Sequence, residues 1–142
     1  MRDQTQPRGI RNNNPLNIRR NPAIKWKGAR VPVTDEKFEE FTTLEYGFRA
    51  ACVLVRSYLN RRLCSCLYEI ISRWAPAKEN NVAAYVTFVS NVSGVEPRAK
   101  LNYTTHKKSI IRIVRAMAIY ENGVSYAHLF PLDLVSRAYE LS

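Results

Sequence analysis

One glutamate in this chain lies where a general acid would be useful. Apolar side chains recur at helical spacing through residues 109–120, and Glu121 takes the next position on the same stripe. A carboxyl group there faces the interior or the floor of a cleft, where loss of hydration raises its pKa. A raised pKa suits an acid that donates a proton near neutral pH. The alternative is a glutamate at a frayed helix end that points to water.

An asparagine-rich segment is the second candidate. Residues 8–20 combine several arginines with Asn12, Asn13, Asn14 and Asn17 around one glycine and one proline. Asparagine tolerates left-handed backbone, and its amide both donates and accepts hydrogen bonds. Two interpretations follow from the residue types. The segment is either a loop that braces itself and enters a short strand, or a loop that binds a ligand rich in hydroxyl and amide groups.

The remaining polar residues give weaker signals. Glu79 precedes a predicted helix, where the helix dipole favours a negative charge, and Tyr85 one turn later is typical of a core aromatic. Four acidic residues are expected at the surface, although one could act as a second carboxylate; they are Asp35, Glu36, Glu39 and Glu40.

No cofactor is expected from the motifs. His106 and His128 have no partner at metal-ligand spacing, and the three cysteines do not form a zinc or disulfide pattern. Phosphate- and dinucleotide-binding glycine motifs do not occur. We therefore expect no metal and no nucleotide at the site.

The elements that position these residues are mainly helices. Apolar periodicity predicts five of them, at residues 44–60, 65–74, 80–92, 104–120 and 131–141. Thr42 or Thr43 is expected to cap the first, and Thr104 or Thr105 the fourth. Prolines and a glycine around Trp26 predict a small β-hairpin lobe near the N-terminus. The expected fold class is thus mainly α (α+β), with residues 1–7 flexible and residues 8–142 forming one domain.

Composition limits the partners. The 142 residues carry a net charge of +10, which favours nucleic acid, an anionic envelope polymer or an acidic protein surface. The charge is scattered, so it is a general bias and not a dedicated basic arm. No apolar run approaches the roughly 18 residues that span a bilayer, and no secretory signal is recognised, so membrane insertion is not expected.

A family resemblance adds to this. Residues 8–19 resemble the RGIRNNNPGNIR signature of a family of phage and prophage virion proteins, with Leu16 where that family usually has glycine. The similarity continues at residues 26–28, 38–41, 46–50, 74–80 and 84–86, and covers roughly residues 8–95. The family is similar to lysozyme-like murein hydrolases, which include lytic transglycosylases. The resemblance implies a lysozyme-like fold.

The order of the segments differs from those enzymes. Their catalytic glutamate ends a helix that precedes the asparagine-rich loop, whereas here the helix ending at Glu121 follows it by about a hundred residues. This difference suggests a circular permutation, which neighbouring chain termini make physically easy.

The resemblance implies a virion-associated peptidoglycan glycosidase, made in the host cytoplasm and acting on the bacterial cell wall. Glu121 would be the acid of a lytic transglycosylase or muramidase that cleaves the bond between N-acetylmuramic acid and N-acetylglucosamine. Substrate-binding roles are expected for Asn12, Asn13, Asn14, Asn17, Glu79 and Tyr85. The alternative is a non-catalytic virion protein that kept the fold and binds DNA or other virion subunits.

Overall fold

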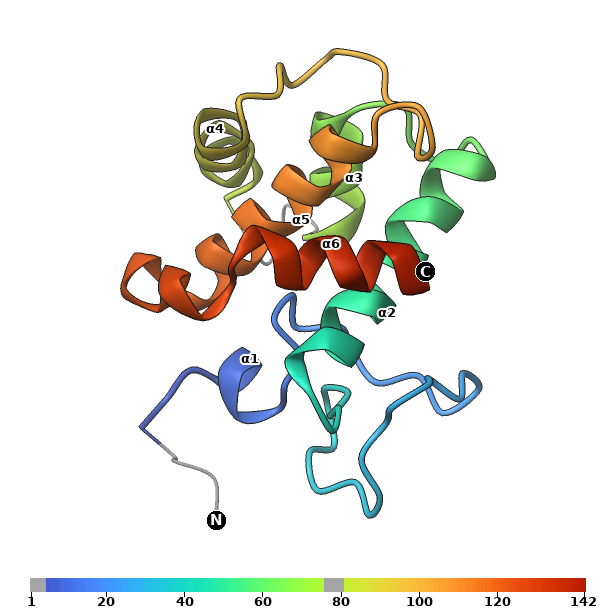
Figure 1. Ribbon diagram of the computed structural model, residues 1–142, viewed down its shortest axis with the longest axis vertical. Coiled ribbons are helices and arrows are strands. Elements are labelled where there is room, and N and C mark those ends of the chain that lie inside the picture. The colour runs from blue at the N-terminus through green and yellow to red at the C-terminus, as the bar shows by residue number, and fades with distance from the viewer. Residues whose placement is uncertain (1–4, 76–80) are drawn as a thin grey trace.

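The computed structural model describes residues 5–75 and 81–142, and these residues are mainly helical. The helices are α1 (Arg8–Arg11), α2 (Leu44–Asn60), α3 (Leu67–Trp74), α4 (Val82–Ser93), α5 (Lys107–Asn122), the 3-10 helix η1 (Val124–Leu129) and α6 (Leu132–Leu141). The predicted helical class is confirmed. Figure 1 shows the larger helices together in one half of the molecule, with α1 and an irregular N-terminal lobe below them.

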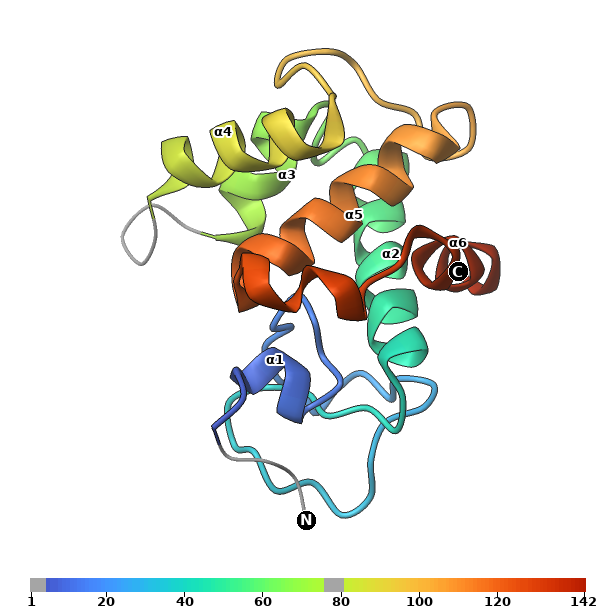
Figure 2. The same ribbon diagram turned by 60° about the vertical axis from the view of Figure 1, so that its left-hand side comes forward.

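Helix α5 is the centre of this arrangement. It packs against α2, α4 and α6, and its C-terminal part also contacts η1 and α1. The apolar stripe predicted for it is fully buried, and the members are Ile110, Ile113, Val114 and Met117. Figure 2 shows α5 running down to the loop that follows α1. The residue that continues the stripe is therefore carried to the boundary between the helices and the N-terminal lobe.

For most helices, the bounds predicted from the sequence agree with the observed bounds to within two residues. Helix α2 has the predicted bounds, and the Thr43 hydroxyl caps it by accepting a hydrogen bond from the Tyr46 backbone N–H. Helix α4 is capped by Asn81 and ends at Gly94, which adopts the left-handed conformation with a φ of 74°.

Three local predictions were wrong or incomplete. Helix α5 begins after His106 and not after a threonine cap, because the N–H groups of Thr104 and Thr105 both donate to the Asn102 side chain. The short helices α1 and η1 were not predicted, since four and six residues are too few to show helical periodicity.

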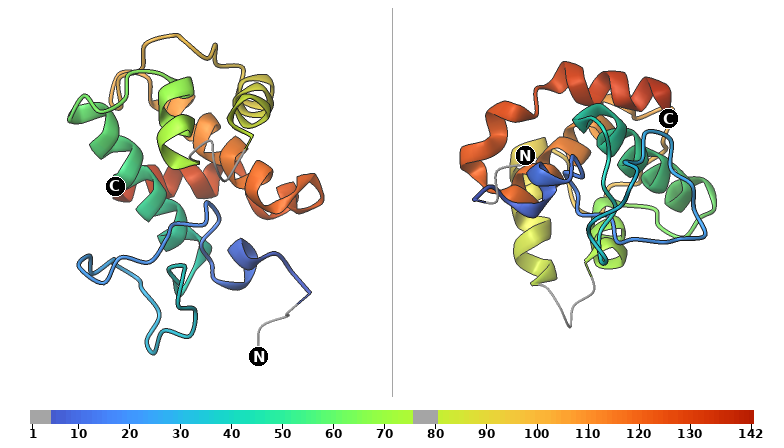
Figure 3. Two further views of the ribbon diagram at one scale, coloured as in Figure 1. Left: turned by 180° about the vertical axis from the view of Figure 1, so that it is seen from behind. Right: turned by 90° about the horizontal axis from the view of Figure 1, so that it is seen from below.

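The N-terminal lobe is held together without regular strands. The predicted hairpin is reduced, in the part of the chain that the structure describes, to two isolated antiparallel bridges, Arg19 with Phe38 and Ala29 with Phe41. Figure 3 shows the lobe as extended, looping chain on one side of the helices. The predicted lobe exists, but its backbone groups need other partners than a strand ladder.

Two carboxylates supply some of those partners. Glu39 and Glu40 were expected at the surface, but their residues are 7% and 1% exposed. Glu40 accepts hydrogen bonds from the backbone and hydroxyl of Thr34 and pairs with Arg30 at 3.2 Å. These bonds hold the pKa of Glu40 below its ordinary value, although burial alone would raise it. The charges serve the lobe's own structure.

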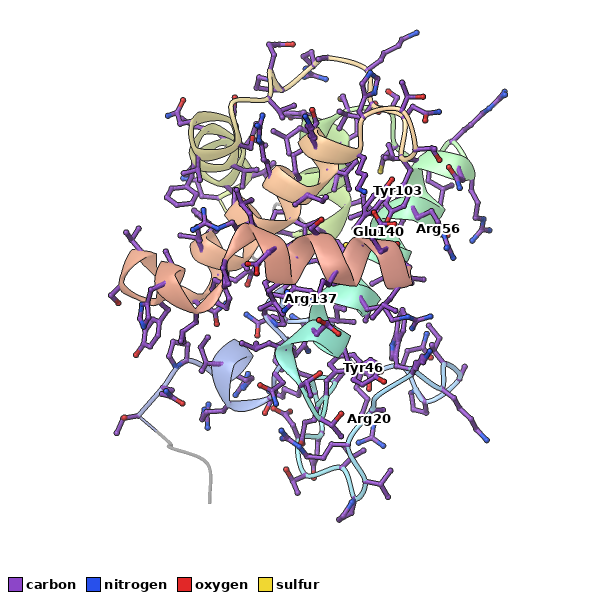
Figure 4. The ribbon with its side chains drawn as sticks, viewed as in Figure 1. Arg20, Tyr46, Arg56, Tyr103, Arg137 and Glu140 are labelled. Carbon is purple, nitrogen blue, oxygen red and sulfur yellow. The ribbon has the colours of Figure 1, made fainter. Side chains whose placement is uncertain are left out.

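Helix α6 closes the helical half over α2. Arg137 donates to Glu45 at the start of α2, with 2.9 Å between Nε and Oε1, and Figure 4 shows it directed toward that end of α2 near Tyr46. The three cysteines are free thiols, and all of them are buried. None of the helices within the described ranges is both long and apolar enough to cross a bilayer.

Gly47 sets how closely α2 approaches the asparagine-rich loop. A Cβ at this position would collide with the Asn13 carbonyl oxygen and lie 2.7 Å from Pro15 Cδ. Gly47→Ala should therefore destabilise the fold by about 2 kcal/mol, the cost of forcing atoms into a packed contact. Urea unfolding followed by circular dichroism measures this change.

Whether Gly47→Ala lowers or raises the stability of the fold tests the close contact between α2 and the loop. Without a clash, glycine to alanine inside a helix stabilises by about 0.5–1 kcal/mol because alanine has the higher helix propensity. A more stable Gly47→Ala protein would contradict the close contact between α2 and the loop.

Candidate active site

The end of α5 and the asparagine-rich loop meet at the carboxyl group of Glu121. Asn17 Nδ2 donates to Glu121 Oε1 at 2.9 Å, and the Tyr85 hydroxyl donates to Oε2 at 2.9 Å. Both donors precede Glu121 in the sequence, and they come from two separate segments, the loop and α4. The sequence predicted that the far end of the chain would bring its acid to this loop, and the structure places them in contact.

The surroundings of Glu121 favour its protonated form. Burial raises the pKa of Glu121 above its ordinary value of 4.5, while the hydrogen bonds from Asn17 and Tyr85 oppose that shift only in part. The side chain is nevertheless not sealed off, because it lines an open cleft. A half-buried carboxyl with a raised pKa and an opening to solvent meets the physical requirements of a general acid.

Tyr85 lies behind the carboxyl and not on the cleft surface. Its residue is 0% exposed, and its ring stacks on Tyr120 with 4.0 Å between centroids. Burial and the neighbouring Glu121 charge raise the pKa of Tyr85 well above 10, so its hydroxyl stays a donor. The expected direct contact of Tyr85 with a substrate is not supported by this position. Tyr85 instead orients Glu121.

The cleft beside Glu121 has a volume of about 490 Å³. Its described walls are Leu16, Asn17, Arg19, Phe38, Trp74, Ala75 and Glu121. Trp74 is fixed there because its indole N–H donates to the Leu16 carbonyl at 3.0 Å. The cleft thus combines two aromatic side chains, an amide, a cation and one carboxyl group, which is a mixture suited to a sugar ligand.

Three of the four asparagines brace the lobe. Asn14 is fully buried, donates to the carbonyls of Ile18 and Glu39, and accepts from the Ile18 N–H. Asn12 donates to Asp35 at 3.0 Å, and Asn13 donates to the Phe41 carbonyl at 3.2 Å. These bonds agree with the other interpretation of the loop, in which it braces itself, and the substrate-binding role expected for these three asparagines stays a prediction.

Asn17 is the asparagine that reaches the cleft. Its φ of 52° is left-handed, and its N–H donates to the Asn14 carbonyl. Leu16 and Ile18 on either side are buried, so the chain is anchored and Asn17 projects toward Glu121. The Asn17 Oδ1 atom is buried and has no hydrogen-bond partner among the described residues.

A second, smaller hollow of about 390 Å³ lies near Asp35. Burial would raise the pKa of Asp35, but hydrogen bonds from the Lys37 and Phe38 backbone and from Asn12 prevail and lower it. A carboxylate that ionises more readily than usual is a poor proton donor near neutral pH. The hollow at Glu121 is therefore the better candidate for chemistry.

Several cleft residues were not singled out from the sequence. Arg19, Phe38 and Trp74 lie within segments that carry the family resemblance, but no site role was predicted for them. The available signal was the tryptophan at the end of the helix predicted for residues 65–74. Glu79, which was predicted to bind substrate, lies outside the described residues.

The part of the chain that the structure describes contains no evident metal-binding site. No group of three or more His, Cys, Asp or Glu side chains there is placed to hold an ion.

Comparison with known proteins places the chain among phage proteins. It is 35% identical over 135 residues to protein P5 of Pseudoalteromonas phage PM2, an alignment that covers 94% of this chain and 80% of that protein. The chain belongs to the P5 family. No family model matches the sequence. The P5 relationship confirms the expected kinship with phage proteins, while the asparagine-rich signature and the lysozyme-like relationship stay predictions.

The raised pKa of Glu121 predicts a pH-dependent cost to stability. Between 4.5 and the higher pKa of the folded protein, the unfolded chain ionises more readily, so stability falls as pH rises through that interval. Glu121→Gln keeps an oxygen for Asn17 and removes the charge. It should raise the melting temperature at neutral pH by about 2 °C or more.

The difference from the parent protein should shrink as pH falls below about 4, where the glutamate is protonated in both states. Thermal unfolding across this pH range measures it, with the exposed Glu36→Gln as the matched control. A Glu121→Gln protein that is less stable than the parent at neutral pH would contradict the raised pKa.

Proposed function

We propose that this P5-family member is a virion-associated glycosidase that cleaves peptidoglycan between N-acetylmuramic acid and N-acetylglucosamine. The observation that carries the proposal is a single half-buried carboxyl group, Glu121, held by two donors at the side of a sugar-sized cleft. Membership of a phage protein family supports a role in infection, since a phage must pass the cell wall. The +10 net charge supports binding to an anionic wall polymer.

Glu121 would act first as the acid. In its protonated form it would donate its proton to the glycosidic oxygen while the bond from that oxygen to C1 of the muramic sugar breaks. The positive charge that develops on that sugar is then close to the newly formed carboxylate. Asn17 and Tyr85 stabilise this carboxylate, because both donate to its oxygens.

The second half of the reaction favours transglycosylation. Hydrolytic glycosidases usually need a second carboxylate to activate water or to attack the sugar. Glu121 is the one acidic side chain among the described residues that line the cleft. Glu121 would therefore take the proton from the C6 hydroxyl of the same muramic sugar, and that oxygen would bond to C1 to give a 1,6-anhydro product without water.

Aromatic side chains would hold the sugars during these steps. Trp74 is half-buried and Phe38 is stacked by arginine side chains, so both rings are fixed at the cleft walls. The C–H faces of pyranose rings pack well against such surfaces. Asn17 lies beside them with its amide already oriented.

The activity is tested with purified peptidoglycan. The protein should release soluble muropeptides with 1,6-anhydro ends, and Glu121→Gln should lower the rate by at least about 100-fold because the proton donor is lost. Glu36→Gln, an exposed acid in the N-terminal lobe, should keep the parent rate. Mass spectrometry of the products and turbidity clearing provide the measurements.

Each result distinguishes a different outcome. Products with reducing ends would identify hydrolysis and reject the single-acid route. Equal rates for Glu121→Gln and the parent would remove Glu121 from the chemistry. No cleavage, together with strong salt-sensitive binding to DNA, would instead support a non-catalytic virion protein whose basic charge contacts nucleic acid or other subunits.

A further inference from the structure

Two hollows on the helical half of the molecule share the side chains of Arg112 and Leu132. One lies between α5 and the start of α6, and the other lies between the end of α4, α5 and the start of α6; each has a volume of about 310 Å³. Helix α5 packs against both neighbouring helices (Figure 1). We call the two hollows together the α5 groove. It shares no described lining residue with the cleft at Glu121.

Apolar side chains in the α5 groove are accessible to solvent. Leu132 at the start of α6 is 49% exposed, and Val92 near the end of α4 is 45% exposed. Ile111 of α5 lines the groove between α5 and α6. A single exposed leucine or valine is ordinary at a protein surface, but here they line adjacent hollows with room for the side chains of a partner.

Cations from α5 border these apolar side chains. Lys108, Arg112 and Arg115 follow one another at spacings of four and three residues, which places them along one face of the helix. Lys108 and Arg112 are exposed, and neither has an ion-pair partner in the part of the chain that the structure describes. Arg115 is engaged differently, because its Nε donates to the Phe130 carbonyl at 2.6 Å.

The acidic residue of the groove is already paired. Asp133 accepts a hydrogen bond from Arg137 one turn further along α6, at 3.3 Å. Among the described lining residues, the α5 groove thus presents two unpaired cations and no unpaired carboxylate. A surface of this kind attracts an acidic ligand, and its apolar hollows favour a ligand that also carries apolar side chains.

We propose that the α5 groove is a docking site for an acidic segment of another protein, whose apolar side chains enter the hollows and whose carboxylates pair with Lys108 and Arg112. Burial of apolar surface supplies affinity, and the charge pairs select the partner and its orientation. Docking at this groove does not depend on the proposed function, because the Glu121 cleft is formed by other described residues.

Three other occupants match the groove less well. A second copy of this chain carries the same net charge of +10 and is repelled. Nucleic acid bases stack on aromatic side chains, and the described lining of the two hollows contains no aromatic residue. A membrane takes up apolar side chains that project from a protein, whereas this surface is hollowed.

Selection from a library of displayed random peptides tests the docking site. The immobilised 142-residue chain should enrich peptides that combine Asp or Glu with Leu, Ile or Phe. An enriched peptide is then synthesised with a fluorescent label, and titration followed by anisotropy measures its affinity. Replacing its acidic residues by Gln, or its apolar residues by Ser, should each weaken binding by about 10-fold.

Variants of the chain locate the binding site. Arg112→Glu should weaken binding of the enriched peptide by about 10-fold or more, because it places like charges together. Arg61→Glu is the matched control, since it changes the net charge equally at an exposed position just beyond the end of α2. Leu132→Ser should also weaken binding, whereas Val124→Ser, which removes an exposed apolar side chain elsewhere, should not. Circular dichroism checks that each variant is folded, and Arg112→Gln replaces Arg112→Glu if the latter is not.

The outcomes separate docking from catalysis. Arg112→Glu should leave peptidoglycan cleavage unchanged, so the proposed function and the docking site can fail independently. Enrichment of no peptide, enrichment of peptides without acidic residues, or an affinity that survives the Arg112 variant would overturn the docking site. Binding to duplex DNA, binding to phosphatidylglycerol vesicles, or self-association in the ultracentrifuge would overturn it as well, if that property is lost in Arg112→Glu and kept in Arg61→Glu.

Discussion

The candidate site depends on one buried amide that fastens the N-terminal loop to the end of α5. Asn122 Nδ2 donates at 2.8 Å both to the Pro15 carbonyl and to Ala118 in its own helix. Gly9 packs so closely against this side chain that a Cβ there would meet Asn122 Oδ1. Glu121 precedes Asn122 and projects about 100° away around the helix. The residue that fixes the loop thus also fixes the acid relative to it, and a one-residue shift would lose both contacts.

Holding a carboxyl group this way opposes folding at neutral pH. Glu121 is half-buried with a raised pKa, and Asn17 has a left-handed backbone. Asn17 Oδ1 is buried and has no hydrogen-bond partner among the residues that the structure describes. Apolar anchors on each side offset these costs. Leu16 is 0% and Ile18 is 7% exposed, and full burial of such a side chain stabilises by about 1.5–3 kcal/mol. The burial of Leu16 and Ile18 therefore adds to the hydrogen bond from Asn17 to Glu121 in holding Asn17 at the cleft.

The sequence predicted those parts that follow from local periodicity. The bounds of α2 and the buried stripe that leads to Glu121 depend on spacing of three and four residues, which one sequence displays. The apolar side chains of the N-terminal lobe show no such regular spacing. The burial of Glu40 depends on Arg30 and Thr34 folding back onto it, and the position of Gly47 depends on the Asn13 carbonyl, so neither could be predicted from neighbouring residues.

The cleft residues also divide into one that local periodicity predicted and others that it did not. Glu121 was found because it ends a periodic stripe. Arg19, Phe38 and Trp74 come from three different segments, and only the folded chain brings them together. Their residue types are common in loops and cores alike, so no spacing distinguishes them.

The asparagine run has a structural explanation that changes what it indicates. A lobe without strand ladders must still pair its buried backbone groups, and a neutral amide can donate and accept at once. Asn14 does both, and Asn12 and Asn13 supply further donors inside the lobe. The run therefore indicates the shape of the lobe. The proposed chemistry depends on a smaller set, Asn17, Tyr85 and Glu121, of which only the first belongs to the run. A related chain that kept the asparagines but lost the glutamate would share this lobe without this acid.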